Sequence, residues 1–551
     1  MTDSSLADIV EMSEPDVTLR PVPVEPARSS TARLPPARWR LSWPAVGAAT
    51  AAALALLVWR NRQVFSRAMY EAGDLAADSR QVEIARNLQL VHGQYSRFGF
   101  YHPGPVYFYV RAAGEWLLRD HLHLVPARFN GQYLGILAVD ALTIGLVAAL
   151  LARRTRRPVM LAVLAALVLL AGTLQPAGSA SHPWMPMVLI WPFALLLVAS
   201  AELGSGEIAA LPFAVLGGAL CVSGSVNTAP FVALVLVMGG VLGHVRRSST
   251  TAVDGALRRS LAWTAVVVVP FAVPLLFDIV HGSDSNVAAI WRYLRTGSTY
   301  RNGLRASVGY AARSWVGQTG YRAGPLAVSG GIVVAGIAAW LLVPAGRRRR
   351  ALGTLAVLVL AASTLGVFYA RRYIDDLHLT YVQVFQVAGP VVLFAALIVA
   401  VVDVVLGRGR PTWLAPTGLV SVMVALALLL SLHHGLTAPG LYTTGVDQVE
   451  SELTTRYPAG AFALDFDLSQ TPLGLSLFVL MHRDGHDICF ANPDFAVTHT
   501  MPPEDLCEPG SDQPRVTVTL SSLDDAGASD AAIGQITGPT GTVVVTATSF
   551  G

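Results

Sequence analysis

The amino-acid sequence predicts a polytopic α-helical membrane protein with a small α/β domain near its C-terminal end. Of its 551 residues, 53% are hydrophobic and only 14% are charged, whereas an ordinary soluble domain carries about 25% charged residues. Apolar runs of about the length of a membrane span recur along the chain. The net charge of +3 is too small to indicate a nucleic-acid partner.

Residues 1–40 are predicted to form a disordered cytoplasmic tail. They are rich in Pro, Ser and acidic residues and show no apolar periodicity, so they bury too little apolar surface to offset the entropy of ordering. The apolar run near 41–59 follows directly. We interpret it as a membrane anchor, because the tail before it is long and no convincing cleavage site follows it.

About eleven transmembrane helices are predicted within residues 41–433. A helix needs about 20 mainly apolar residues to cross the hydrocarbon core. After the first run, the others lie near 133–152, 159–174, 185–201, 208–224, 230–243, 261–280, 325–343, 352–368, 384–406 and 413–432.

The arginines orient these helices, because the positive-inside rule assigns short arginine-rich loops to the cytoplasm. These loops include 153–157, 246–259, 347–350 and 408–410. The loops predicted to face the exterior are 60–130, 281–324 and 371–383. The N-terminus is then cytoplasmic, in a plasma membrane, and the C-terminal portion lies outside.

Residues 434–551 are predicted to form a small extracytoplasmic α/β domain. The segments 461–466, 475–481 and 515–520 alternate or run apolar like short strands or a helix, with turn-forming residues between them. Cys489 and Cys507 are predicted to form a disulfide, since disulfides persist in an oxidising compartment.

The first long loop carries the candidate catalytic carboxylates. Asp74 and Asp78 fall four residues apart, on one face of a predicted amphipathic segment over 64–90. Glu83 would point roughly 140° away from Asp78 unless the helix breaks. A carboxylate in this loop is well placed to act as a general base. The alternative is that these acids only solvate a helix beside the membrane.

Residues 93–109 are too broken by Pro and Gly to form a transmembrane helix. Pro103 biases His102 to an extended conformation. Arg97 offers a forked donor for phosphate. Tyrosines in this stretch could stack on a sugar or line a lipid groove, but an interfacial loop with an aromatic belt is the equal alternative.

These residues resemble a family. The arrangement Asp78-x-x-x-x-Glu83, followed by Gln-Tyr-Ser-Arg-Phe-Gly-Phe-Tyr-His-Pro-Gly-Pro over 94–105, is similar to a largely uncharacterised actinobacterial group with the architecture of the GT-C glycosyltransferases. Pro274-x-x-x-Asp278 followed by Asn286 is similar as well, as is the segment 480–485. The chain contains no lysine, which fits a GC-rich actinobacterial genome.

The resemblance implies that a sugar moves from a polyprenyl-phosphate donor to an envelope glycan or lipid acceptor on the outer face, with inversion. Asp78 best matches the carboxylate that deprotonates the acceptor in such enzymes, and Glu83 would be a second carboxylate. Arg97 and His102 would bind the lipid phosphate. The substrate-lining residues would be Tyr95, Ser96, Tyr101, Tyr107, Asp278 and Asn286.

Two further loops carry charged clusters. Arg292 and Arg295 alternate with aromatic residues in the second long loop, which suits a lipid-linked phosphate but equally suits plain headgroup contact. The polar cluster over 371–378 is predicted to form ion pairs within itself.

Metal use and the class of protein stay open. A divalent metal is possible but doubtful, because no paired acidic residues directly follow the first span. Asp140 and Asp403 lie within predicted spans and would favour a lipid or glycan transporter or flippase. A noncatalytic envelope-assembly protein is the third possibility. Convergence of Asp78, Arg97 and His102 on one cavity that opens both to the outer leaflet and to the exterior would favour the enzyme.

Overall fold

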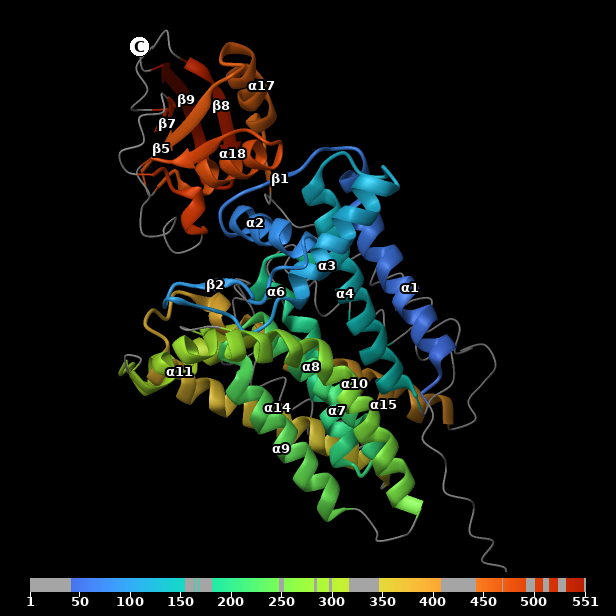
Figure 1. Cartoon of the computed structure of the whole chain (residues 1–551). Coiled ribbons are helices and arrows are strands. Elements are labelled where there is room, and N and C mark those ends of the chain that lie inside the picture. Colours follow the sequence, from blue (N-terminus) through green and yellow to red (C-terminus); the bar gives the residue numbers. More distant parts are fainter. Residues whose placement is uncertain are drawn as a thin grey trace, which may run out of the picture. The chain divides into compact units, whose positions relative to one another are not determined.

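The computed structural model shows a helical membrane protein with a C-terminal sheet domain (Figure 1). Residues Leu41–Gly551 form one compact unit, and the tail predicted over 1–40 lies outside the described residues. The residues described are 41–153, 163, 167, 181–246, 252–281, 285–296, 300–316, 346–407, 442–467, 469–491, 501–508, 515–523 and 532–549.

Within those residues, seven helices are long and apolar enough to cross a membrane. They are Trp43–Arg60, Arg128–Ala152, Met185–Gly204, Val226–Val245, Gly255–Val280, Arg349–Tyr373 and Thr380–Val399. Ile208–Gly224 is a shorter apolar helix. Each of these coincides with a predicted run, which confirms the polytopic class. Apart from positions 163 and 167, the runs predicted near 159–174, 325–343 and 413–432 lie outside the described residues.

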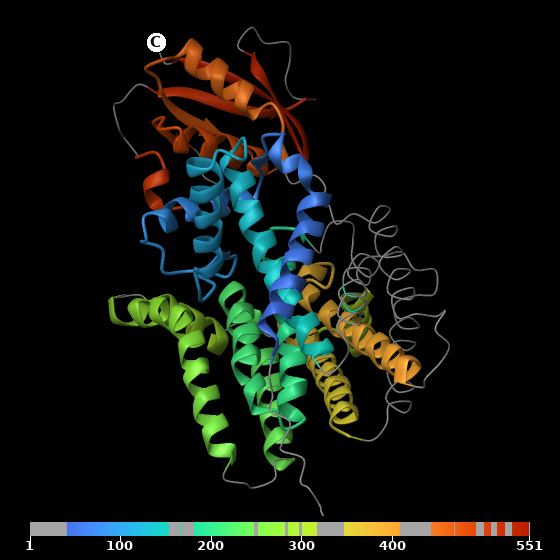
Figure 2. The ribbon, with the colours of Figure 1, turned by 90° about the vertical axis from the view of Figure 1, so that its right-hand side faces the viewer.

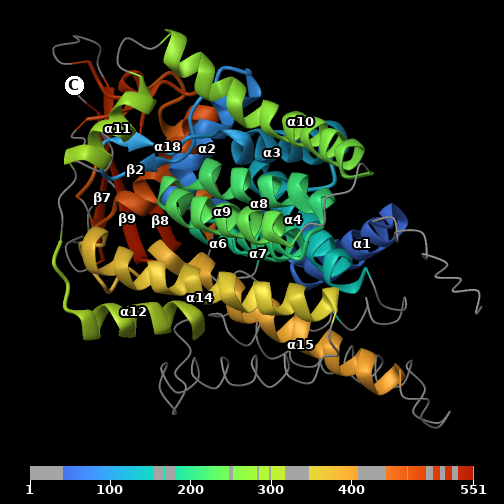
Figure 3. The same cartoon turned by 90° about the horizontal axis from the view of Figure 1, so that it is seen from below.

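The spanning elements pack around α7 (Ile190–Gly204), in which every residue is buried. α7 contacts α4, α8, α9, α14 and α15, and Figure 3 shows this group from below. The other apolar helices are α1 (Trp43–Arg60), α4 (Arg128–Ala152), α8 (Leu211–Gly224), α9 (Ala229–Val245), α10 (Ala252–His281), α14 (Arg347–Tyr373) and α15 (Ala388–Gly407). The four-residue helix α6 (Met185–Val188) precedes α7 within one candidate span.

Shorter helices lie between and beyond the spans. They are α2 (Asp74–Arg86), α3 (Val106–Glu115), α11 (Asn286–Thr296), α12 (Leu304–Val316), α17 (Val446–Arg456) and α18 (Thr471–Arg483). A π-helical segment covers Trp116–His121. Single 3-10 segments cover Arg62–Phe65, Ile208–Ala210, Val226–Thr228, Thr380–Val387 and Pro503–Asp505.

Arginines that end several spans meet at one end of the helix bundle. Arg153, after α4, forms an ion pair with Glu202 of α7. Arg246, after α9, donates to the Gly204 carbonyl at 2.9 Å and to Thr354 Oγ1 of α14 at 2.7 Å. These loops therefore share one end, as the arginine pattern predicts. Which side of the membrane this end faces stays a prediction.

The C-terminal portion forms a five-stranded sheet in the order β6-β5-β7-β9-β8. β5 is parallel to β6 and β7, while β9 is antiparallel to β7 and β8. Buried side chains from α17 and α18 complete its core. A disulfide joins Cys489 to Cys507. The strands are β5 (Ala461–Asp465), β6 (Ile488–Phe490), β7 (Arg515–Ser522), β8 (Ala532–Gly538) and β9 (Gly541–Ser549).

The first long loop and the C-terminal portion pack against each other. β1 (Tyr70–Glu71) pairs antiparallel with β4 (Tyr442–Thr443). Ala76 and Ala77 of α2 belong to the core of the sheet domain, and α18 contacts α2 (Figure 2). α2 also packs against α3, through Val82 and Phe108. The helix that bears the candidate carboxylates is therefore held from two sides.

Charged groups add to the contacts between α2 and the C-terminal portion. Arg80 of α2 forks onto Asp505, with Nε donating to Oδ2 at 3.1 Å and Nη2 donating to Oδ1 at 3.2 Å. Such a bidentate pair fixes orientation as well as distance. Asp505 lies two residues before Cys507, and the disulfide ties that segment to β6.

Candidate functional site

The site is built on α2, whose start is fixed by Gly73. This glycine has φ of +56°, a left-handed value that favours glycine. Asp74 occupies the first helical turn, where the helix dipole stabilises a negative charge. Asp78 follows one turn later, so both carboxylates project from the same face.

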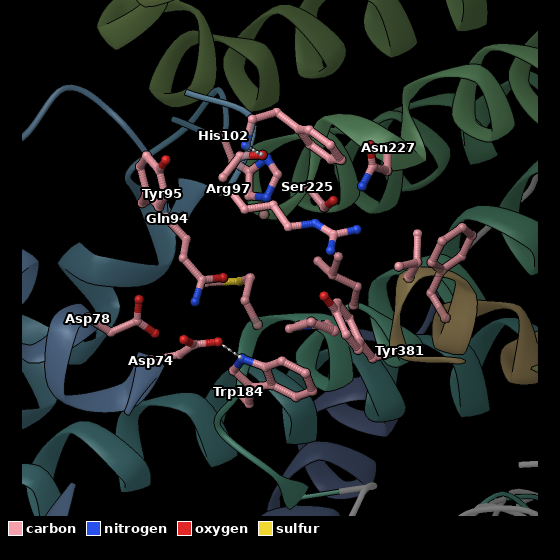
Figure 4. A pocket seen from close by; sticks show the side chains of 18 of the residues that line it. Asp74, Asp78, Gln94, Tyr95, Arg97, His102, Trp184, Ser225, Asn227 and Tyr381 are labelled. Atoms are coloured by element: carbon pink, nitrogen blue, oxygen red, sulfur yellow. Dashed lines mark hydrogen bonds between the residues drawn. The ribbon is translucent and has the colours of Figure 1, made fainter. Parts of the chain in front are cut away.

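Asp74 and Asp78 line a cavity of about 340 Å³. The aromatic loop (residues 93–109) forms another wall with Gln94, Tyr95, Arg97 and His102, as Figure 4 shows, and Ser96 of this loop also lines the cavity. Asp78, Arg97 and His102 thus line one cavity. Further lining residues come from distant segments and include Trp184, Ser225, Asn227, Asp375 and Tyr381.

Asp78 forms a buried ion pair with Arg111. Arg111 of α3 donates from Nη1 to Asp78 Oδ2 at 2.8 Å, and the two side chains are 0% and 2% exposed. Burial raises the pKa of Asp78 to about 6, although Arg111 opposes the rise and nearby Asp74 adds to it. Asp78 is therefore ionised at neutral pH and fixed in direction.

Asp74 is the more accessible carboxylate. Its side chain is exposed at the cavity, and its Oδ2 accepts a hydrogen bond from Trp184 Nε1 at 3.0 Å. Protein atoms crowd the group on its other sides, and this burial raises its pKa, while the Trp184 hydrogen bond acts the other way. A ligand in the cavity can reach Asp74 more easily than Asp78.

The aromatic loop is a tight hairpin of β2 (Tyr95–Ser96) and β3 (Phe100–Tyr101). Gly99 turns it with φ of +78°. Backbone hydrogen bonds from Gly93 to His102 and from His102 to Gln94, at 2.7 and 2.8 Å, close its base. Gly104 lies against Ser223, where a Cβ atom would overlap the serine. Glycine at this position thus lets the loop dock on α8.

Arg97 projects from the hairpin tip into the cavity. Its Nη2 donates to Asp375 Oδ1 at 2.6 Å, and 43% of its side chain is exposed. It also lies over the Phe98 ring, with its guanidinium carbon 5.0 Å from the centroid. The prediction that the 371–378 cluster pairs within itself is wrong for Asp375, because folding brings the hairpin tip to this loop.

His102 is a neutral donor rather than a cation. Its Nδ1 accepts the Val226 backbone N–H at 3.4 Å, so the ring proton lies on Nε2. Burial lowers the pKa of His102 to about 4. Of the two residues predicted to bind phosphate from this loop, only Arg97 offers a positive charge at neutral pH.

Tyr101, Asn286 and Asp278 form a clamp outside the cavity lining. The Asn286 side chain accepts the Tyr101 N–H at 2.7 Å and donates to the Tyr101 carbonyl at 2.8 Å. Asp278 of α10 accepts the N–H groups of Asn286 and Val287, at 3.1 and 3.0 Å. These residues, predicted to line the substrate, instead tie the hairpin to the start of α11.

Two other predicted site residues lie away from the cavity. Tyr107 is fully buried and donates its hydroxyl to the Leu220 carbonyl at 3.2 Å. Glu83 lies 3.1 Å from Arg80 and 3.4 Å from His482. It faces the C-terminal portion because α2 continues unbroken past Asp78. Arg292 and Arg295 are exposed on α11 and are not among the lining residues.

The donor set does not suit a protein-held metal ion. Asp74 and Asp78 each accept a hydrogen bond from a fixed donor, Trp184 or Arg111. Within the part of the chain that the structure describes, no three His, Cys, Asp or Glu side chains lie close enough to share an ion.

Several cavity residues escaped the sequence analysis as site residues. Asp74 carried a usable signal, because it stands one helical turn before Asp78. Trp184, Asn227 and Tyr381 come from three separate segments. Their arrival at one cavity depends on the packing of α6, α8 and the segment before α15, for which no local sequence pattern exists.

Spanning helices, a first loop with carboxylates at a cavity and a C-terminal α/β portion define a multi-pass membrane protein, and its likeness to solved structures of ArnT gives it a GT-C-like fold. The crystal structure of ArnT from Cupriavidus metallidurans in the apo state matches with a TM-score of 0.55 and 14% identity, over 90% of this chain and 96% of that chain. ArnT bound to undecaprenyl phosphate matches with a TM-score of 0.52 and 15% identity, over 92% and 98%.

No family model and no curated protein matches the chain. Identities of 14% and 15% establish a shared fold, and a fold by itself does not fix an activity. The function has to be argued from the residues of the site.

Proposed function

We propose that the chain is a membrane glycosyltransferase that moves a sugar from a polyprenyl-phosphate donor to an envelope glycan or lipid acceptor on the outer face. One observation carries the proposal: two carboxylates of α2 and the Arg97 guanidinium line the same cavity. Support for the donor class comes from ArnT, which shares the fold and has been crystallised with undecaprenyl phosphate.

We assign the general base to Asp74 and a supporting role to Asp78. Asp74 takes the proton from the acceptor hydroxyl, whose oxygen then attacks the anomeric carbon of the donor sugar. The bond from that carbon to the phosphate oxygen breaks, its electron pair leaves with the polyprenyl phosphate, and the anomeric configuration inverts. Asp78 is less suited to proton transfer, because its Oδ2 is bonded to buried Arg111.

Arg97 would bind the phosphate that carries the developing charge. Guanidinium groups have five N–H donors, so Arg97 can hold a phosphate while one N–H stays with Asp375. Hydrogen bonds between such a cation and a phosphate are about twice as strong as neutral ones. His102 would add a neutral Nε2–H donor from the same wall.

Transfer is expected to fall as the pH drops through about 6. Below its pKa of about 6, Asp78 takes up a proton and its charge no longer balances Arg111. The pKa of Asp74 is also raised, so acid removes the base in the same direction. His102, with a pKa of about 4, stays neutral over this range. A profile of kcat/KM from pH 5 to 8 measures the effect.

The His102→Gln variant serves as the control for that profile. The transfer rate of this variant can differ from that of the parent protein, but its kcat/KM should fall at the same pH. A profile that is flat between pH 5 and 7 would contradict the assignment of the carboxylates.

The proposal itself is tested with purified protein in lipid nanodiscs. A labelled polyprenyl-phosphate sugar and an envelope extract are supplied, and label that moves to the extract is measured. Asp74→Asn provides the matched inactive protein. Envelope glycan analysis of a deletion strain would name the linkage.

Assays of the purified protein in nanodiscs and in proteoliposomes separate the competing classes. Equal transfer of label by the parent and by Asp74→Asn would reject the mechanism. Movement of intact lipid across proteoliposomes without transfer would favour a flippase. Absence of both sugar transfer and lipid movement would favour an envelope-assembly protein. Asp140, a candidate for a transport pathway, is buried in α4 and does not line the 340 Å³ cavity.

A further inference from the structure

α11 holds the aromatic hairpin with one of its faces. Ile290 is 8% exposed and packs with Phe100. The Tyr293 ring stacks on Phe98 with centroids 4.8 Å apart and lies 5.1 Å from Phe100. Together with the Asn286 clamp on Tyr101, these contacts make α11 the platform on which the hairpin rests.

The opposite face of α11 is exposed and combines apolar with cationic side chains. At about 100° per residue, Trp291, Arg292 and Arg295 project away from Ile290 and Tyr293. Trp291 is 56% exposed, and Leu294, at the flank, is 58% exposed. Arg295 lies over the Trp291 ring, with its guanidinium carbon 4.7 Å from the centroid.

α11 follows a membrane span. α10 contains the candidate span Gly255–Val280, and large apolar side chains near its end are exposed, namely Leu276, Phe277, Ile279 and Val280. Such side chains suit lipid. α11 contacts α10 and is turned away from its direction (Figure 3).

We propose that α11 lies on the membrane surface and binds anionic lipid headgroups through Arg292 and Arg295. Trp collects at the boundary between lipid and water, and amphipathic helices with Arg on the polar side bind anionic surfaces. Trp291 and Leu294 are exposed on a helix that contacts α10, whose last residues also expose large apolar side chains. A bilayer with negative headgroups satisfies both the apolar and the cationic parts of this face.

This contact would set the level of the cavity relative to the membrane. The Asn286 clamp and the Phe98–Tyr293 stack transmit the position of α11 to the hairpin tip, which carries Arg97. Under the proposed function, which this one consequence assumes, Arg97 would then lie near the level of lipid phosphates. The membrane contact itself does not depend on any enzymatic activity.

The depth of α11 can be measured with a single fluorescent label. Cys221 is buried and Cys489 is bonded to Cys507, so a new surface cysteine is the preferred site of labelling. Leu294→Cys carries an NBD label in proteoliposomes that contain brominated lipids. We expect quenching and a blue-shifted emission.

Two other label positions bracket the result. Val266→Cys, on the exposed side of α10, should be quenched most by lipids brominated deep in the acyl chain. Thr455→Cys, exposed on α17, should not be quenched. A label at position 294 that behaves like the one at position 455 would overturn the proposal.

The headgroup part of the proposal is tested by lipid composition. Adding phosphatidylglycerol to phosphatidylcholine should increase quenching at position 294, and Arg292→Gln/Arg295→Gln should remove that increase. Arg456→Gln, an exposed charge loss on α17, should leave it in place. If phosphatidylglycerol has no effect, or the double variant still responds, the arginines do not bind headgroups. None of these readouts requires sugar transfer.

Discussion

Replacing Asp74 with asparagine is expected to reduce transfer at least about 100-fold, the lower end of what a general base contributes. Asparagine keeps the size of the side chain and can still accept the hydrogen bond from Trp184 Nε1, but it cannot take the proton of an acceptor hydroxyl. The rate of label transfer in nanodiscs measures the loss. Thermal unfolding of the variant should match that of the parent.

Asp447 supplies the matched control for this variant. It is also an exposed aspartate in the first turn of a helix, α17, but it lies in the sheet domain. Asp447→Asn should therefore transfer at the parental rate. If Asp74→Asn keeps full activity while Asp78→Asn is folded and inactive, the base is Asp78 instead.

Asp78→Asn is expected to lose stability as well as activity. Arg111 is 0% exposed, and removing one partner of a buried ion pair leaves the other charge uncompensated, at a cost of about 3–5 kcal/mol. Chemical unfolding in detergent micelles measures the change. Loss of activity in this variant alone thus says little about catalysis.

The double variant Asp78→Asn/Arg111→Met separates the two effects. Removing both charges should recover most of the stability, because no uncompensated charge remains buried. Activity should stay low if Asp78 shapes the electrostatics of the cavity. As a control, Asp375→Asn breaks the more exposed pair with Arg97 and should change stability by no more than about 1 kcal/mol. A stable Asp78→Asn single variant would contradict the argument.

Most of the fold could be predicted because each membrane-spanning helix requires a run of about 20 mainly apolar residues, which is visible in the sequence. Each candidate span among the described residues matches an apolar run. The segments 461–466 and 515–520 form strands β5 and β7, as their local patterns indicate. The segment 475–481 could be either a strand or a helix and lies within helix α18. Helix contacts with the sheet decide between these forms.

The site was predictable only where its signal is local. The spacing of Asp74 and Asp78 places both on one helical face, and the Pro and Gly residues of the aromatic stretch indicate a fixed loop. Arg111 shows no such signal, since it looks like an ordinary charge in α3. Only the fold reveals that it is fully buried against Asp78.

The protonation state of His102 and the roles of Asn286 and Asp278 could not be predicted from the sequence either, because both depend on tertiary packing. His102 looks like a cation for phosphate until burial lowers its pKa to about 4. Asn286 and Asp278 look like substrate residues until the structure shows them holding backbone groups. Polar residues that satisfy a buried loop and polar residues that bind a ligand have the same composition.

The pairing of β1 with β4 bears on how the protein is made. β1 and α2 leave the ribosome with the first loop, but β4 and the sheet domain that covers Ala76 and Ala77 are synthesised last. During most of translation, Ala76 and Ala77 of α2 are therefore not yet covered by the sheet domain, and Arg80 does not yet have its partner Asp505. The helix that carries Asp74 and Asp78 therefore reaches its final environment only after the sheet domain has been synthesised.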